Sequence, residues 1–504
     1  MRLKRTLLAS SVIAALGGFL FGFDTVVISG AEQQLQKIFT PAADLSTWWA
    51  NFWHGFLMAS ALIGTVIGSM VVGKPADRLG RRGVMFWLAI LYFVSAVGSA
   101  LSWNWYSLVA FRILGGLGVG GASVVSPMYI AEIAPAKVRG RLVALAQFNI
   151  VFGILAAFVS NYVIADLQLG ENEWRWMFGV EAIPAAIYFL LLFATPRSPR
   201  WLAAQGRDDE ALDVLQRVGV DAEGESAADE LASIRTSIDL DHHNLDEPFF
   251  QRKYLKPIML AFAIAAFNQL SGINAVLYYS KRIFESAGFV EKAGLLNSVG
   301  LGLVNLVFTM VGISLIDYFG RKKLMIVGSL GYILSLGVTA WAFSTYGGEF
   351  SAVGDAVDHV AELESAAADG TLSAPDAAAE LQSARQSLEL AVGAAATGGR
   401  IVVLSLLAFI ASHAVGQGAV IWVFIGEIFP NRLRARGQAF GSFTHWIFAA
   451  VISQTFPLIA EKSGAHVFLF YAVCMVGQLA WVLVKMPETK GVPLEEIQKQ
   501  MGIE

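Results

Sequence analysis

The sequence predicts an all-α membrane protein with twelve transmembrane helices in two six-helix halves. Of the 504 residues, 56% are hydrophobic and only 15% are charged, a composition too apolar for a soluble domain. The apolar residues gather in runs of the length that crosses a bilayer. In addition, charged motifs of the first half recur in the second half, as expected of a duplicated membrane protein.

The first expected span follows three basic residues, Arg2, Lys4 and Arg5, and continues to about Gly30. This run is longer than the apolar region of a signal peptide, so we interpret it as a transmembrane helix. The twelve spans are expected near residues 8–30, 52–73, 84–102, 106–130, 142–164, 176–195, 257–280, 296–316, 322–345, 400–425, 437–459 and 466–486.

Basic residues lie in alternate connections between these spans, at 74–82, 137–141, 252–256, 321–323 and 432–436. Cytoplasmic loops carry an excess of Lys and Arg. We therefore expect a multi-pass protein of the cytoplasmic (inner) membrane with both termini in the cytoplasm.

The internal repeats divide the chain into domains. The motif at 77–82 recurs 240 positions later at 317–322, and the motif at 132–139 recurs 295 positions later at 427–434. About 55 additional residues therefore lie between the second pair of motifs. We expect an N-terminal half at 1–195, a cytoplasmic helical linker at 196–256 and a C-terminal half at 257–504. An extracytoplasmic insertion at about 347–399 has helical spacing and predicts a small hairpin.

The repeated motifs place acidic and basic residues at the expected cytoplasmic mouth. Asp and Arg four positions apart, next to a Glu and a second Arg, can form ion pairs that stabilise one conformation and break in another. The alternative is that these charges only anchor loops at the membrane surface. The expected cytoplasmic gate consists of Asp77, Arg81, Glu132, Arg139, Asp317, Arg321, Glu427 and Arg434.

Amides and phenols interrupt the apolar run at 267–279. Asn268, Gln269, Asn274 and Tyr278 lie where a helix would bring them close to one surface. Amides that donate and accept hydrogen bonds, beside aromatic rings, suit a neutral polyhydroxyl ligand. The alternative is hydrogen bonding between packed membrane helices.

Asp24 lies in the middle of the first span, where a carboxylate is costly unless it is paired or protonated. Arg112, in the fourth span, is the expected partner. A change in their separation would let Asp24 bind and release a proton. The alternative is a static structural ion pair.

The sequence does not indicate binding of nucleic acid, dinucleotides or metal ions, or catalysis. The net charge of −4 includes no basic domain, so no nucleic acid partner is expected. The glycines at 116–121 match a dinucleotide motif but lie inside a span, where close helix packing explains them. The histidines lack metal-ligand spacing, and no catalytic motif is present. We expect no enzyme activity, no metal and no cofactor.

These motifs together resemble the sugar porter family of the major facilitator superfamily. The resemblance is carried by residues 18–24, 112–116, 196–202, 269–279 and 422–430 and by the two Asp-x-x-Gly-Arg loops. It implies the major facilitator fold and a monosaccharide site between the halves. The implied substrate contacts are Gln147, Asn268, Gln269, Asn274, Trp422, His445 and Trp446, with Tyr278 and Tyr279 near the outer gate.

Departures from the family pattern leave the sugar open. Arg197 replaces a Glu, Asn268 replaces a common Gln, Ile154 and Ala449 replace amides, and His445 stands where Gln or Asn is usual. The resemblance implies proton-coupled symport of a hexose or pentose by a monomer in the lipid bilayer, because coupled members carry the acid at Asp24. The alternatives are an uncoupled uniporter and a sugar sensor that does not transport.

Overall fold

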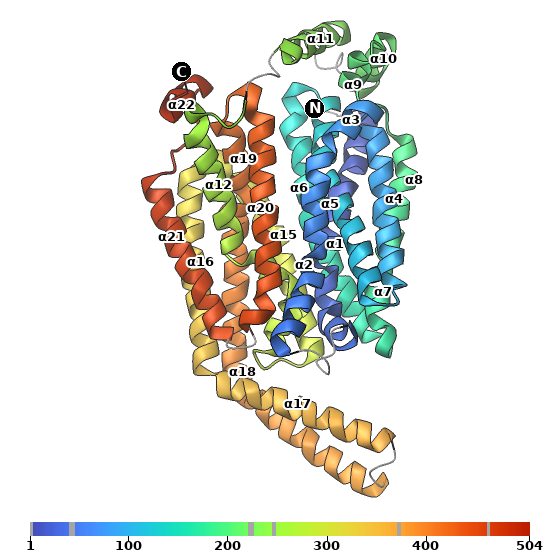
Figure 1. The fold of residues 1–504 in the computed structure, drawn as a ribbon, viewed down its shortest axis with the longest axis vertical. Helices are drawn as coiled ribbons and strands as arrows, with labels where there is room; N and C mark the ends of the chain where they lie inside the picture. The colour runs from blue at the N-terminus through green and yellow to red at the C-terminus, as the bar shows by residue number, and fades with distance from the viewer. Residues whose placement is uncertain are drawn as a thin grey trace.

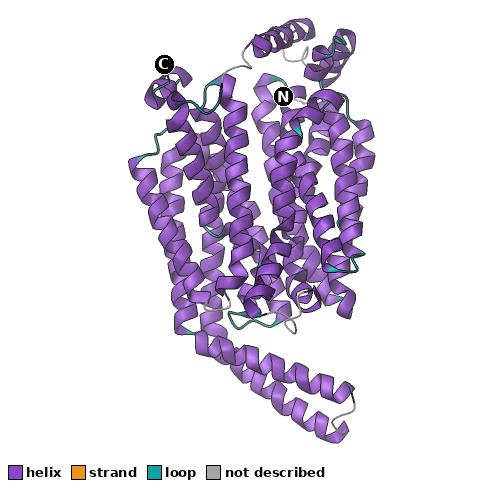
Figure 2. Cartoon of the chain, in the orientation of Figure 1, coloured by secondary structure: helices purple, strands orange, loops and turns teal. Residues whose placement is uncertain are grey.

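Apolar runs of spanning length form helices here because a helix satisfies its backbone hydrogen bonds internally, as a membrane requires. The computed structural model describes residues 4–39, 46–219, 226–243, 248–369, 374–460 and 464–503. This part of the chain contains helices and loops and no strand (Figure 2). Twelve of its helical segments are long and apolar enough to cross a membrane. The prediction of an all-α membrane protein with twelve spans is confirmed.

The first six spans form the N-terminal half. Its α-helices are α1 (Arg5–Phe39), α2 (Thr47–Val71), α3 (Gly73–Leu79), α4 (Arg81–Ala100), α5 (Trp105–Ile133), α6 (Ala136–Asp166), α7 (Glu173–Gly179) and α8 (Ala182–Leu191). Three short helices follow as a linker: α9 (Pro199–Ala204), α10 (Asp208–Val218) and α11 (Ala227–His243).

The last six spans form the C-terminal half. Its helices are α12 (Leu255–Leu270), α13 (Ile273–Tyr278), α14 (Ser280–Glu285), α15 (Glu291–Phe319), α16 (Arg321–Thr345), α17 (Gly347–Ala368), α18 (Ala374–Val415), α19 (Gln417–Ile428), α20 (Asn431–Ala460), α21 (Gly464–Val484) and α22 (Leu494–Met501).

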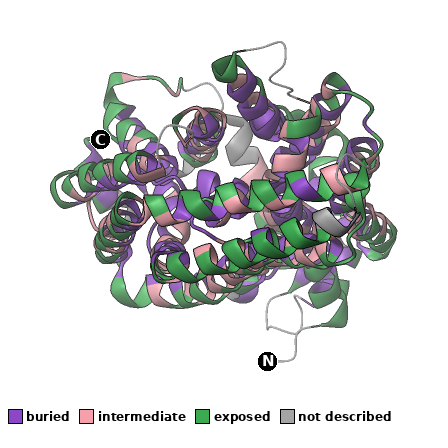
Figure 3. Cartoon of the chain, turned by 90° about the horizontal axis from the view of Figure 1, so that it is seen from below, coloured by how far each residue is buried: buried purple, intermediate pink, exposed green. Residues whose placement is uncertain are grey.

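The two halves stand side by side, and both termini lie at one end of the bundle (Figure 1). We call this end the terminal face; the linker helices α9 to α11 lie there as well. We call the opposite end the hairpin face, because α17 and the first part of α18 project from it as an antiparallel pair. Seen from that face, the hairpin crosses in front of the bundle and is largely exposed (Figure 3).

Small residues allow the helices of each half to pack closely. A Cβ atom added to Gly116 of α5 would lie 1.9 Å from the Ala61 carbonyl oxygen of α2. One added to Gly22 of α1 would lie 1.9 Å from the Ile150 carbonyl oxygen of α6. The glycines at 116–121 therefore serve helix packing, as expected for membrane helices.

Among the described residues, the buried apolar side chains form a single core on the hairpin side and two cores on the terminal side. The first core includes residues of both halves, such as Leu57 and Phe158 with Tyr278 and Phe456. Toward the terminal face, one core belongs to the N-terminal half and the linker, and the other belongs to the C-terminal half. The halves are thus packed against each other at the hairpin face and are separate at the terminal face.

The first and tenth spans differ most from their expected bounds. The first span was expected to end near Gly30, but α1 continues to Phe39. The tenth was expected to begin near residue 400, but α18 is one helix of 42 residues that starts in the hairpin and enters the bundle. The second helix of the hairpin is therefore continuous with a spanning helix.

Candidate functional site

The polar stretch at 267–279 is a broken helix. Gly272, with φ of +83°, separates α12 from α13, and a Cβ atom there would lie 2.4 Å from the Tyr471 ring. Only glycine fits both the left-handed backbone and this contact. The break lets Asn274 Nδ2 donate to Gln269 Oε1 over 2.9 Å. Discontinuous helices are typical of binding sites in transporters.

Gln269 joins this broken helix to α20. Its Nε2 atom lies 3.0 Å from Asn268 Oδ1 and 3.1 Å from His445 Nε2. His445 packs between Trp422 and Trp446, with ring centroids 5.3 and 4.7 Å away. Amides and aromatic rings from α12, α13, α19 and α20 are thus in mutual contact, and Gln269 itself is only 1% exposed.

The amide cluster extends further than the sequence indicated. Asn268 lies 3.4 Å from Gln417, which donates to Gln478 over 2.9 Å, and Gln478 donates to Ser329. All four side chains are buried. An amide in an apolar span is the signal that identifies Gln417 and Gln478. This branch has its partners within the C-terminal half, so it fits the alternative of hydrogen bonding between helices.

Three expected substrate contacts lie apart from this cluster. Gln147 on α6 is half-buried, and the structure gives it no contact with the amides among the described residues. Tyr279 donates to the Ser453 carbonyl over 2.8 Å and stacks on Phe456. Tyr278 is fully buried, within electrostatic range of Asp24 and Arg112.

Asp24 and Arg112 form a buried ion pair inside the N-terminal half. Arg112 Nη1 lies 2.6 Å from Asp24 Oδ1, and both side chains are at most 3% exposed. The second carboxylate oxygen, Oδ2, has no partner among the described residues, and neither does Arg112 Nε. The pair is therefore incompletely satisfied, which is costly at this depth.

Glu181 completes this cluster. It was not among the functional residues expected from the sequence. It directly precedes α8 as the N-cap residue, is 1% exposed, and interacts with both Asp24 and Arg112. Its Oε1 atom has no hydrogen bond among the described residues. The available signal was that Glu181 is the only carboxylate in the expected sixth span. Two buried carboxyl groups thus lie within electrostatic range of one guanidinium group, which is bonded to Asp24.

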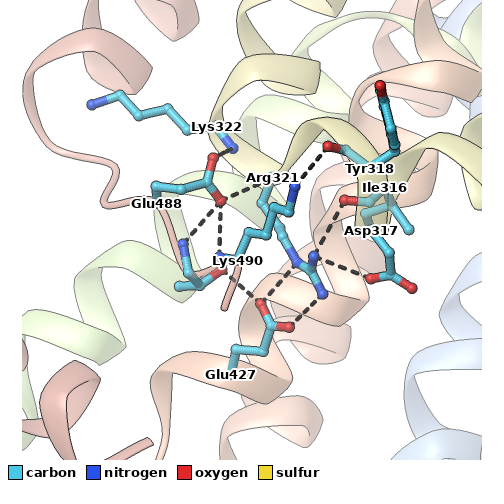
Figure 4. A network of polar contacts seen from close by, with 9 residues as sticks. Ile316, Asp317, Tyr318, Arg321, Lys322, Glu427, Glu488 and Lys490 are labelled. Atoms are coloured by element: carbon cyan, nitrogen blue, oxygen red, sulfur yellow. Dashed lines mark hydrogen bonds and ion pairs between the residues drawn. The ribbon is translucent and has the colours of Figure 1, made fainter. Parts of the chain in front are cut away.

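The charged motifs form one network in each half at the terminal face. Arg321 contacts Glu427 over 2.7 Å and Asp317 over 3.2 Å. Glu488 accepts the backbone amides of Arg321 and Lys322 at 2.9 and 3.1 Å, as Figure 4 shows. Glu488 belongs to the segment after α21 and was not among the expected gate residues.

The N-terminal half repeats this arrangement. Arg81 contacts Glu132 over 2.9 Å and Asp77 over 3.0 Å. Ser198, ahead of α9, donates to Glu132. The described contacts of each network lie within one half, with Ser198 of the linker added to the N-terminal one, so they do not join the two halves.

The two remaining residues of the expected gate behave differently. Arg139 donates to the Ala134 carbonyl over 3.3 Å, and Arg434 is exposed. Neither contacts Glu132 or Glu427 within the part of the chain that the structure describes.

Comparison with known proteins gives a consistent result. The family model described as "Sugar (and other) transporter" matches residues 10–354 and 386–501. The chain is 35% identical to a glucose transport protein of Synechocystis, over 98% of this chain and 97% of that protein. It is 34% identical to the D-xylose-proton symporter of Escherichia coli, over 97% and 94% of the two chains.

Solved structures agree with these relatives. The structure superposes on the partially occluded inward open conformation of the xylose transporter XylE from E. coli with a TM-score of 0.78. That match has 32% identity and covers 97% of this chain and 99% of the other.

Proposed function

The chain belongs to the sugar transporter family of the major facilitator superfamily, and we propose that it carries a monosaccharide across the cytoplasmic membrane together with a proton. It is accordingly a transporter and not an enzyme. The observation that carries the coupling is the buried group of Asp24, Glu181 and Arg112, in which two carboxyl groups face one fixed positive charge. Such a group is stable with one proton added, so it can load and release a proton as its surroundings change.

The sugar site is proposed at the broken helix. Gln269, Asn274 and His445 offer donors and acceptors, and Trp422 and Trp446 offer ring faces for the apolar side of a sugar. The contacts among these side chains would be exchanged for contacts with hydroxyl groups. Relatives named for xylose, arabinose and glucose transport support a pentose or hexose.

The orientation follows from the basic loops, which lie at the terminal face. We propose that this face is cytoplasmic, that the hairpin face is extracytoplasmic, and that the protein acts as a monomer in the inner membrane. The shared core at the hairpin face then corresponds to an outside-closed state. Sugar and proton bind from outside, the halves rock about the central site, and both are released inside.

Uptake into proteoliposomes tests the proposal. Labelled xylose, arabinose, glucose and a disaccharide are offered with and without an inward proton gradient. We expect one or more monosaccharides to accumulate above the external concentration only when the gradient is present. Equilibration without accumulation under both conditions would instead identify an uncoupled uniporter, and binding without uptake would identify a sensor.

A further inference from the structure

A buried ion pair joins the two halves at the hairpin face. Arg282 of α14, in the C-terminal half, contacts Glu32 of α1, in the N-terminal half, with N–O distances of 2.7 and 3.0 Å. Glu32 is 1% exposed and Arg282 is 23% exposed. Neither residue belongs to the proposed sugar or proton site.

A third helix holds the carboxylate in place. His54 of α2 is fully buried, and its Nε2 atom lies 2.5 Å from Glu32 Oε1. Arg282 also donates to Gln36, one turn after Glu32, and Gln36 donates to Asn51 over 2.9 Å. Both acceptors of Arg282 thus come from α1, while α2 fixes their orientation.

The location of this pair distinguishes it from the other ion pairs. Among the described residues, only two Lys or Arg ion pairs cross between the halves, Glu32 with Arg282 and Lys292 with Asp166, and both lie at the hairpin face. The second is exposed on both sides, at 65% and 56%. Exposed ion pairs contribute little to the stability of a conformation, whereas breaking a buried ion pair is strongly destabilising.

Water can reach the edge of the pair. An open cavity of about 1500 Å³ lies between the bundle and the hairpin, and its lining includes Gln36, Asn51 and Arg282 on one side and Asp355 and Asp358 of α17 on the other. The two charges can therefore be hydrated as soon as the halves separate. Hydration is what would offset the loss of the pair in an open state.

We propose that Glu32, His54 and Arg282 form a clasp that closes the transporter at the hairpin face and must open in every cycle. Glu32 and Arg282 set the balance between the closed and open states of this face. His54 is a positioning residue that acts through Glu32. The inference rests on the proposed alternating access, but it does not depend on which sugar is carried or on whether a proton is coupled.

Distances between spin labels in the full chain test the clasp without sugar. Cys474→Ser removes the native thiol. Trp49→Cys with Ile459→Cys reports the distance across the hairpin face, since these exposed residues lie near the start of α2 and the end of α20. Met70→Cys with Ala435→Cys reports the distance across the terminal face.

Glu32→Gln and, independently, Arg282→Gln are expected to raise the ratio of open to closed hairpin face about ten-fold or more. The terminal-face pair should shorten in the same molecules.

The matched control is Lys292→Gln, which removes the exposed ion pair across the same interface and should leave both distances unchanged. His54→Gln should cause a smaller opening, and none beyond that of Glu32→Gln when the two are combined. Unchanged distances in both Glu32→Gln and Arg282→Gln would overturn the clasp, as would an equal opening in Lys292→Gln. Because no uptake is measured, failure of symport in proteoliposomes and failure of the clasp are separate outcomes.

Discussion

At the scale of single residues, the proposed coupling depends on Asp24 and its buried partners. A carboxylate in an apolar span predicts a partner, and Arg112 is the only basic residue in the expected fourth span. The structure places the two 2.6 Å apart. Glu181 escaped the same reasoning because the need for a counter-charge was already met by Arg112. The sequence shows a lone carboxylate in the sixth span, but only the fold shows that it joins Asp24 and Arg112.

We expect Asp24→Asn to abolish accumulation and to preserve sugar binding and exchange. The substitution keeps the shape of the side chain but removes its charge, so no proton links the gradient to the movement of the halves. Asp166→Asn, which alters an exposed carboxylate, is the control. Concentrative uptake by the Asp24→Asn protein, measured in proteoliposomes with an inward proton gradient, would contradict the assignment.

Gln269→Ala and Trp422→Ala should weaken sugar binding. Each loss of a buried polar pairing costs about 1–3 kcal/mol, which corresponds to roughly 5- to 150-fold in Kd. Ligand titration by calorimetry or Trp fluorescence measures the change; Gln417→Ala, in the amide branch that stays within the C-terminal half, tests whether any amide has this effect. Equal loss in Gln417→Ala would show that the cluster serves packing and not binding.

The break between α12 and α13 belongs to the scale of elements, and sequence reasoning treated the same residues as one helix. A glycine in an apolar span favours either helix packing or a break, and the sequence does not distinguish them. The contact of Gly272 with Tyr471, a residue nearly two hundred positions away, shows that this glycine serves a break in the helix. For this reason Asn274 reaches Gln269, five positions earlier, across a turn.

Gly272→Ala should therefore disrupt the site. Its positive φ is strained for alanine, and the added methyl group would overlap the Tyr471 ring. We expect a lower melting temperature and sugar binding weakened at least ten-fold, because the methyl group would have to displace the helix break. Gly337→Ala, where a Cβ atom meets nothing within 4 Å, is the control. Wild-type affinity in Gly272→Ala would contradict the role of the break.

The hairpin is an element with two parts. Phe350 and Val353 at its base are buried against the bundle, and Gly288 lies against Phe350 and Ala395. The family model skips residues 355–385, which form the outer part. Packing thus joins only the base to the transporter.

Deleting residues 355–385 and closing the gap with a short Gly/Ser linker should leave uptake within about two-fold of the parent, because no buried residue of the three cores of the bundle is lost. Deleting residues 348–398 removes Phe350 and Val353 as well. It should lower the melting temperature, since burying each such side chain contributes about 1.5–3 kcal/mol. Strongly reduced uptake by the shorter deletion, at normal membrane expression, would show that the outer hairpin takes part in transport.

At the scale of the whole molecule, the sequence predicted the spans and the repeat but not the conformational state. Twelve apolar runs and positive loops depend on local composition, so they are readable in one sequence. The clasp cannot be predicted in this way. The expected first span ends before Glu32, and Arg282, the partner of Glu32, lies 250 positions away. Which face is closed depends on such long-range pairs.

Glu285, beside the clasp, gives the closed hairpin face a pH dependence. It accepts a hydrogen bond from Gln33 of the other half and faces Lys281, Glu291 and Glu32. Burial raises the pKa of Glu285 to about 7 from an ordinary 4.5, against the opposing effect of Lys281. In an open, hydrated hairpin face this pKa returns toward its ordinary value, so the closed state binds the proton more tightly.

The sign of the effect follows from this difference. The stabilisation of the closed face is complete below about pH 4.5 and is lost as the pH rises to about 7. With pKa values of about 7 in the closed face and 4.5 in the open face, the Trp49→Cys and Ile459→Cys labels should report up to roughly 60-fold more open hairpin face at pH 7.5 than at pH 5, in the absence of sugar. Glu285→Gln, which mimics the protonated side chain, should keep the low-pH distances across this window. A Glu285→Gln protein with the same pH profile as the parent would assign the titration to another group, because the other charges around the clasp are unchanged in both proteins.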